Sequence, residues 1–249
     1  MSAVPATELL PLTEQGRRFS TSRTVRLGDV DTRGQVRFDA IARYLQDVAS
    51  DDALTARLPN AMGWVVRRTM IRVDEPCRLN ENIELTTYCT GFGRSWAERR
   101  TSIGGDAGGA IEAVSLWVQI DTETGRPARL GDEFVARYGE AAAGRTVSSK
   151  LSLPPPPSDA RRGNWSFRAT DLDPFEHVNN AAQWSLLESL DAFEDRRGVA
   201  ELEYLAPVGL GAMELLVAGT SAWLLVGDRT ASAYRWTPAA AAHDGAPAV

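Results

Sequence analysis

Four consecutive prolines, Pro154–Pro157, interrupt the chain a little beyond its middle. Proline fixes its backbone φ angle and has no N–H donor, so such a run is incompatible with a helix interior or a central strand. It forms an extended and fairly stiff spacer instead. We therefore predict that residues 139–163 are a Pro-rich linker between two halves of the 249-residue chain, a length that allows two domains of about 100–150 residues.

The part before the linker shows strand and helix patterns in a simple order. A strand is predicted at 19–27 and a turn at 28–34, and apolar residues at helical spacing predict a helix over 36–50. Turn-forming residues then separate four β-rich runs. These runs are 64–73, 83–91, 95–103 and 111–121.

The part after the linker repeats this order. A strand is predicted at 165–169, and Trp184, Leu187 and Leu190 form one apolar stripe of a helix predicted at 179–193. Four further predicted strands complete this half: 199–205, 213–220, 222–226 and 231–236.

The repeat extends to single residues. Asp171 and Asp173 follow Asp29 and Asp31 at a constant offset of 142 residues, and each pair precedes a predicted helix. A second matching pair of segments precedes a strand in each half: Glu75-Pro-Cys-Arg-Leu79 and Ala206-Pro-Val-Gly-Leu210. Two matches in the same order indicate a duplication. A helix followed by an antiparallel sheet, made twice, predicts an α+β fold of two tandem hotdog units, each a long central helix wrapped by an antiparallel β-sheet.

These patterns predict five parts of the chain. They are a flexible leader at 1–18, an N-terminal hotdog at 19–138, the linker at 139–163, a C-terminal hotdog carrying the active site at 164–237 and a disordered tail at 238–249.

The composition excludes several classes of protein. A net charge of −6 argues against a general nucleic-acid binder. Lys150 is the only lysine, so nearly all cations are arginines, which bind carboxylates and phosphates well. Cys77 and Cys89 are too few for a disulfide scaffold and are expected to be buried thiols. With no signal-peptide pattern and no apolar run of about 18 residues, we expect a cytoplasmic protein without a membrane segment.

Few residues remain for catalysis by elimination. Of the two histidines, His243 lies in the predicted tail, so histidine chemistry falls to His177. One such histidine and two separated cysteines do not make a zinc site, and we expect neither a metal nor another cofactor. The chain also lacks a Gly-x-Ser-x-Gly elbow, a phosphate-binding P-loop and a Gly-x-Gly-x-x-Gly motif.

The segment from Asp171 to Asn180 packs three acids, one histidine and two asparagines into a predicted strand-to-helix junction. Asn179 or Asn180 is suited to cap the helix, whose free N–H groups suit an oxyanion or a polarised thioester carbonyl. Asp173 is suited to orient water or to act as a general base, and His177 to share a proton. A purely structural cap is the alternative.

This segment and its surroundings strongly resemble the acyl-ACP thioesterases of plants and bacteria. The likeness covers about residues 19–218, and the stretches that carry it are Tyr44–Ala49, Trp64–Val73, Leu116–Arg126, Gly131–Glu133, Asp171–Asn180, Trp184, Leu187–Ser189 and Glu203-Tyr204. The resemblance implies hydrolysis of a fatty acyl-ACP thioester to a free fatty acid and holo-ACP. The implied partners are acyl carrier protein and the acyl thioester.

The resemblance also implies roles for single residues. Asp173 and His177 match catalytic positions of the family, with Asn179 and Asn180 beside them. The family's asparagine two residues before the histidine is replaced by Phe175, and its acid past the Glu-Tyr pair by Ala206 or Pro207. Glu176, Asn179 or Asn180 are candidates to substitute for them, and Glu188 on the predicted helix is another carboxylate. The candidates to line an acyl tunnel are Trp64, Trp117, Phe175 and Trp184.

Several alternatives remain open. One is an acyl-CoA thioesterase, and another is a non-catalytic acyl-thioester binding module, which the changes at Phe175 and Pro207 favour. A hydratase fits less well, because its Asp-x-Asn-x-x-His pattern differs from the spacing of Asp173 and His177. The arginine pairs, including Arg99-Arg100, are expected to be solvated, with docking of an acidic carrier protein as the alternative. The exposed strand edges of hotdog units also allow a homodimer.

Overall fold

The computed structural model of the chain describes residues 9–11, 13–58, 63–190 and 196–239. Most of the predicted tail, part of the leader, the end of the predicted second helix at 191–193 and His243 lie outside the described residues.

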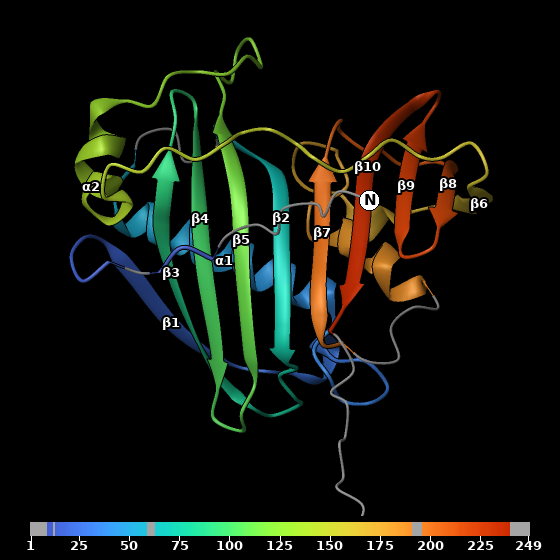
Figure 1. Cartoon of the computed structure of the whole chain (residues 1–249), viewed down its shortest axis with the longest axis horizontal. Helices are drawn as coiled ribbons and strands as arrows, with labels where there is room; N and C mark the ends of the chain where they lie inside the picture. Colours follow the sequence, from blue (N-terminus) through green and yellow to red (C-terminus); the bar gives the residue numbers. More distant parts are fainter. Residues whose placement is uncertain (1–8, 12, 59–62, 191–195, 240–249) are drawn as a thin grey trace, which may run out of the picture.

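The described strands form one antiparallel sheet in the order β1-β3-β4-β5-β2-β7-β10-β9-β8-β6 (Figure 1). Their bounds are β1 Arg18–Thr24, β2 Trp64–Glu75, β3 Asn82–Phe92, β4 Trp96–Gly105, β5 Ala110–Gln119, β6 Arg161–Trp165, β7 Gly198–Tyr204, β8 Met213–Ala218, β9 Ser221–Val226 and β10 Arg229–Pro238. The first five places belong to the first half of the chain and the last five to the second. The halves meet where β2 pairs with β7, from Arg68 opposite Glu203 to Val73 opposite Gly198.

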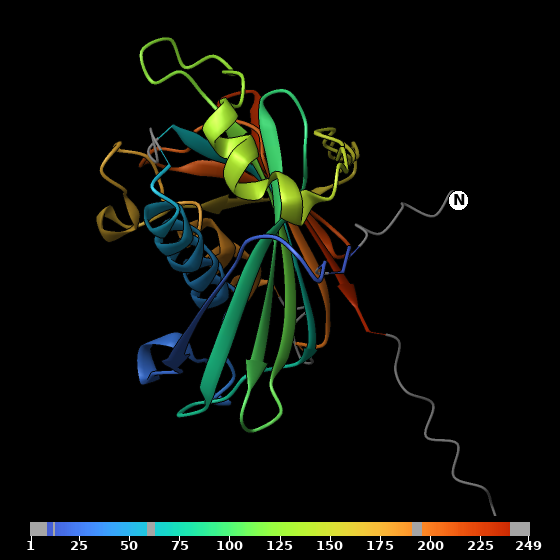
Figure 2. The same cartoon turned by 90° about the vertical axis from the view of Figure 1, so that its left-hand side faces the viewer.

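Helix α1, Phe38–Thr55, lies across one face of the sheet (Figure 2). Its buried apolar residues recur at helical spacing, as Ile41, Leu45 and Val48 do, so one face of the helix packs against the sheet. The helix begins after Arg37, whose backbone is extended, and carries Asp39 in its first turn, where the helix dipole favours an acid.

The second helix differs from its prediction. The structure has a 3-10 helix, η3, over Ala182–Ser189, in place of an α-helix at 179–193. Trp184, Leu187 and Leu190 are spaced by three residues, and residues three apart eclipse one another in a 3-10 helix. That stripe therefore fits the tighter helix, in which Trp184 and Leu187 are fully buried and Leu190 packs against the same core.

The linker prediction needs two corrections. Helix α2, Asp132–Ala142, extends into the predicted start of the linker, since Phe134, Tyr138, Ala141 and Ala142 form a buried stripe. At the other end, β6 begins inside the predicted linker, and the strand predicted at 165–169 gives way to a short 3-10 helix, η2, at Ala169–Asp171.

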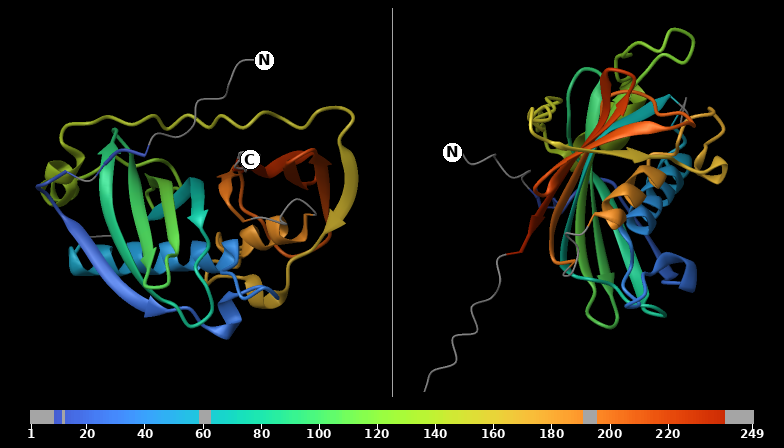
Figure 3. Two further views of the ribbon diagram at one scale, coloured as in Figure 1. Left: turned by 60° about the horizontal axis from the view of Figure 1, so that its bottom comes forward. Right: turned by 90° about the vertical axis from the view of Figure 1, so that its right-hand side faces the viewer.

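The segment between α2 and β6 contains no helix or strand and connects the two halves (Figure 3). Glu203 on β7 accepts the backbone N–H groups of Ser152 and Leu153, and the indole of Trp223 donates to the Pro154 carbonyl at 2.8 Å. These contacts hold the proline run against the sheet.

The two halves share one apolar core. The ring of Phe38, at the start of α1, stacks on Trp184 of η3 at a centroid distance of 5.9 Å and meets Trp236 of β10 edge-on at 5.7 Å. Because all three rings are almost fully buried, the first half cannot pack correctly without the second.

Candidate functional site at the repeated turn

The same turn occurs once in each half, and an aspartate holds it in both. Oδ1 of Asp31 accepts the backbone N–H groups of Arg33 and Gln35 at 2.8 and 2.9 Å. Oδ1 of Asp173 accepts those of Phe175 and His177 at 2.9 and 3.2 Å. An Asp side chain that bonds its own backbone two residues on is a common way to fix a turn.

The backbone around these aspartates repeats as well. Isolated β-bridges join Val30 to Val36 and Leu172 to Val178. The Val36 N–H donates to the Cys77 carbonyl, and the Val178 N–H donates to the Val208 carbonyl. The two pairs of matched sequence segments are therefore brought together in the same way in each half.

One residue of the second turn is strained relative to its counterpart. Gly34 has a φ of 75° and Glu176 a φ of 61° at the equivalent position. The left-handed region suits glycine, whereas any other residue there carries a conformational cost. The Glu176 side chain is exposed, and it does not line the cavity described next.

A cavity of about 720 Å³ lies beside the second turn. Its wall comes mainly from α1, α2 and the strands of the first half, and the second half contributes Asp173, Pro174, Phe175, Asn179 and Asn180. Of the predicted tunnel residues, Trp64, Trp117 and Phe175 line it. Trp184 lies in the shared core instead, where its indole donates to the Tyr204 hydroxyl at 2.9 Å.

Of the predicted catalytic residues, Asp173, Asn179 and Asn180 line the cavity and His177 does not. Asp173 lies at the cavity and uses only Oδ1 for the turn, so its second oxygen is not occupied by those hydrogen bonds. Asn179 caps the following turn by accepting the Ala181 N–H at 2.8 Å. The Asn180 carbonyl accepts the Tyr204 hydroxyl. The His177 side chain is exposed, and His177 is not among the described residues that line the cavity.

Glu188 has structural partners. Its Oε1 accepts the Phe38 backbone N–H at 2.7 Å, at the start of α1, and its carboxylate pairs with Arg196. Arg196 also reaches Asp31 at 3.2 Å, and the two carboxylates raise its pKa against the opposing effect of burial. Glu188 therefore joins the two repeats and is already engaged away from the cavity.

A charged cluster around the buried Asp52 lies on the other side of the cavity, where two of its members, Arg99 and Tyr138, line the wall. No sequence motif indicated it. We call Arg17, Asp52, Arg99 and Tyr138 the Asp52 cluster. Asp52 is 1% exposed, and it accepts Arg17 Nε at 2.7 Å, Arg99 Nη1 at 2.7 Å and the Tyr138 hydroxyl at 2.8 Å.

The members of this cluster come from four separate parts of the chain, so no short motif predicts it. The expectation that Arg99-Arg100 is a solvated pair is also wrong. Successive residues of a strand point to opposite faces, which sends Arg99 inward to Asp52 and Arg100 outward to Glu112.

Neither a metal site nor a membrane-spanning helix occurs among the described residues. In the part of the chain that the structure describes, no group of three or more His, Cys, Asp or Glu side chains is placed to hold a metal ion. None of the described helices is both long and apolar enough to cross a membrane.

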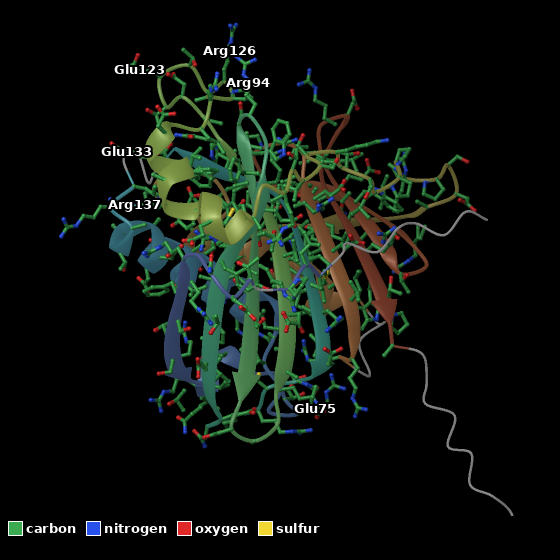
Figure 4. The ribbon with its side chains drawn as sticks, turned by 60° about the vertical axis from the view of Figure 1, so that its left-hand side comes forward. Glu75, Arg94, Glu123, Arg126, Glu133 and Arg137 are labelled. Atoms are coloured by element: carbon green, nitrogen blue, oxygen red, sulfur yellow. The ribbon has the colours of Figure 1, made fainter. Side chains whose placement is uncertain are left out.

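The surface around α2 carries charges of both signs. Arg94, Arg126 and Arg137 project outward there, and Glu123 and Glu133 lie among them (Figure 4). The arginines near α2 therefore do not form a patch of a single sign.

Comparisons with known proteins agree with this description. The model of the acyl-ACP thioesterase N-terminal domain matches residues 16–138. The uncharacterized protein Rv2001 of Mycobacterium tuberculosis is 33% identical over 170 residues, which are 68% of each chain. The chloroplastic oleoyl-acyl carrier protein thioesterase of Coriandrum sativum is 26% identical over 205 residues, with 72% of this chain and 55% of that protein covered.

The fold has a close counterpart among solved structures. The 12:0-ACP thioesterase from Umbellularia californica superposes with a TM-score of 0.73 at 21% identity, covering 91% of this chain and 100% of the other. The predicted α+β fold of two hotdog units is thereby confirmed, with the short η3 as the helix of the second unit.

Proposed function

Because the chain belongs to the acyl-ACP thioesterase family, we propose that it hydrolyses a fatty acyl-ACP thioester to a free fatty acid and holo-ACP. The observation that carries the proposal is the position of Asp173, a carboxylate with one oxygen outside the turn, on the wall of a cavity of about 720 Å³. An acyl chain fills the cavity, and its thioester lies beside Asp173.

Asp173 acts as the general base. Its second oxygen takes a proton from a water molecule, and that water attacks the thioester carbonyl carbon. The C–S bond then breaks, and the oxygen of the water stays on the released fatty acid. The proton held by Asp173 passes to the departing pantetheine sulfur. A well-placed base of this kind contributes about 10²–10⁴-fold to a rate.

Asn180 supports the developing negative charge on the carbonyl oxygen. It lines the cavity, and its backbone N–H donates to no other residue in the described part of the chain. A preorganised donor aimed at such an oxyanion is among the most effective catalytic devices. Asn179 positions this donor, because its cap fixes the turn that leads into η3.

His177 has a smaller part in this proposal than the sequence indicates. Its backbone completes the Asp173 turn, while its side chain is exposed. We assign its backbone the positioning of Asp173 and its exposed side chain a supporting part in proton exchange with solvent. Phe175, which stands where the family has an asparagine, lies at the cavity with 56% of its surface exposed and is suited to contact the apolar part of the substrate.

The test is thiol release from acyl-ACPs of several chain lengths, beside the matched acyl-CoAs. We expect turnover on acyl-ACP by the wild-type chain, its loss in Asp173→Asn and a partial loss in His177→Ala. Equal turnover on acyl-CoA would assign a broader thioesterase. No turnover on any substrate by the folded protein would overturn the proposal.

A second candidate is an acyl-thioester binding module without hydrolysis. It is favoured by Ala206 and Pro207, which stand where the family has an acid, and by the exposed His177 side chain. Saturable acyl-ACP binding with no thiol release would select it. Asp173→Asn would then leave binding unchanged.

A further inference from the structure

The cavity wall is not uniformly apolar. Near Trp64 and Phe134, whose ring centroids lie 5.4 Å apart, it is aromatic. On β4 it includes Arg99, whose side chain is 15% exposed although the residue lies inside the fold. A cavity for a simple hydrocarbon chain has no need of a guanidinium group, since a buried charge is expensive unless it is paired and hydrogen-bonded.

The partners of Arg99 use only part of its hydrogen-bonding capacity. Nη1 donates to Asp52, at 2.7 Å, and to Thr87, at 3.3 Å, and the guanidinium lies over the Tyr138 ring, 5.6 Å from its centroid. A guanidinium carries five N–H donors in a planar fork, and Nε and Nη2 take no part in these two bonds. Donor capacity is therefore left on the cavity side of the Asp52 cluster.

The cluster also carries a surplus of positive charge. Its two cations, Arg17 and Arg99, share the single carboxylate of Asp52, and both oxygens of that carboxylate are occupied. The neighbouring acid, Glu98, has its own partners: Oε1 accepts the Thr90 hydroxyl, and Oε2 lies 3.7 Å from Arg68. An additional acceptor at Arg99 would complete the arrangement.

We propose that Arg99 is a specificity-determining residue that selects acyl chains bearing an oxygen acceptor, a hydroxyl, keto or carboxylate group, on the part of the chain that reaches β4. This inference rests on the proposed hydrolysis of acyl thioesters at the same cavity. A saturated chain in this position removes water from the remaining N–H donors of Arg99 and offers them no acceptor. An oxygen on the chain accepts hydrogen bonds from these donors. Sites built to hydrogen-bond a substrate oxygen discriminate strongly against the analogue that lacks it.

The test compares acyl-ACPs of equal chain length that carry no oxygen, a hydroxyl at successive positions, or a terminal carboxylate. A hydrogen bond to a charged group predicts a kcat/KM roughly 10-fold or more higher for the best oxygenated chain. Arg99→Met removes this preference by raising KM for the oxygenated chain, and Arg99→Lys retains part of it. Asp52 keeps Arg17 and Tyr138 in the methionine variant, which protects the fold.

Arg100→Met is the matched control. Arg100 is the next residue of the same strand, but it points to the opposite face, where it pairs with Glu112 and donates to the carbonyls of Leu9 and Leu10. Its loss should leave the substrate preference unchanged. A preference equally reduced in both variants, or absent from the wild-type chain, would overturn the role of Arg99.

Binding of free acids separates this inference from the proposed function. Trp64 and Trp117 line the cavity, so their fluorescence reports the binding of a fatty acid and of its hydroxylated counterpart without catalysis. Tighter binding of the hydroxylated acid that depends on Arg99, in a protein that hydrolyses nothing, keeps the inference and removes the hydrolase. Hydrolysis of all acyl-ACPs at one rate, with equal binding of both acids, does the reverse.

Discussion

Glu188 accepts the backbone N–H of Phe38 at 2.7 Å, across 150 residues of sequence and between the two repeats. The first N–H groups of an α-helix lack partners within the helix, so the second half of the chain caps the central helix of the first. The same carboxylate pairs with Arg196, which is 4% exposed. Glu188, which the sequence offers as a candidate auxiliary carboxylate, thus links the two repeats structurally.

Replacing Glu188 by alanine should destabilise the protein by about 3 kcal/mol, because it removes a helix cap and leaves Arg196 buried with a weaker partner. Chemical denaturation measures this loss. Glu188→Gln keeps an acceptor for Phe38 but not the charge, so its loss should be smaller. Turnover per folded molecule should stay near the wild-type value in both variants, and a 100-fold fall in the glutamine variant would restore Glu188 to the catalytic machinery.

The positions of most strands along the chain were predictable, because β-rich runs and turn residues are local signals. β2 and β8, for example, begin at the predicted residues. The helices were less predictable. The proline run favours a linker that starts at residue 139, which lies inside α2. The sequence interpretation did not include this helix, although Phe134 and Tyr138 have helical spacing. The stripe of Trp184, Leu187 and Leu190 predicts an α-helix, but its spacing of three residues fits the 3-10 helix η3 that the structure has.

The candidate site divides in the same way. The Asp173 turn lies within one short motif and has a duplicate at Asp31, so sequence alone locates it. Arg99 and Asp52 are 47 residues apart and meet only because α1 crosses the inner face of β4. Their contact depends on the tertiary fold, and no spacing along the chain signals it.

Asp173→Asn should separate the two roles of this residue. An asparagine oxygen still accepts the N–H groups of Phe175 and His177, so the turn and the melting temperature should change little. Loss of the base should lower kcat by about 100-fold or more. Asp31→Asn is the control in the other repeat, where the same substitution should leave kcat unchanged. A comparable loss of kcat in both variants would show that the turn, and not the base, matters.

Asp39 should contribute to acid denaturation. Burial opposes its ionisation, but hydrogen bonds from Arg37 and Arg43 outweigh that effect and hold the pKa of Asp39 below its usual value. A carboxyl whose pKa is lower in the folded state stabilises the protein above the unfolded pKa, about 3.9, and this contribution is lost as the pH falls through the folded pKa. The free energy of unfolding should therefore fall more steeply below pH 4 for the wild type than for Asp39→Asn. Parallel curves for the two proteins would contradict this assignment.

Cys89 offers a probe of the cavity. Burial raises the pKa of Cys89 to about 11 and that of Cys77 to about 12, so both thiols are protonated and unreactive near neutral pH. A thiol reagent should label both slowly in the native protein and rapidly after unfolding. Of the two cysteines, only Cys89 lines the cavity, so a bound fatty acid should slow the labelling of Cys89 further. The Cys77→Ser variant, in which Cys89 is the single thiol, is the best protein for this measurement. Equal labelling of Cys89 with and without the acid would place the acyl chain outside this cavity.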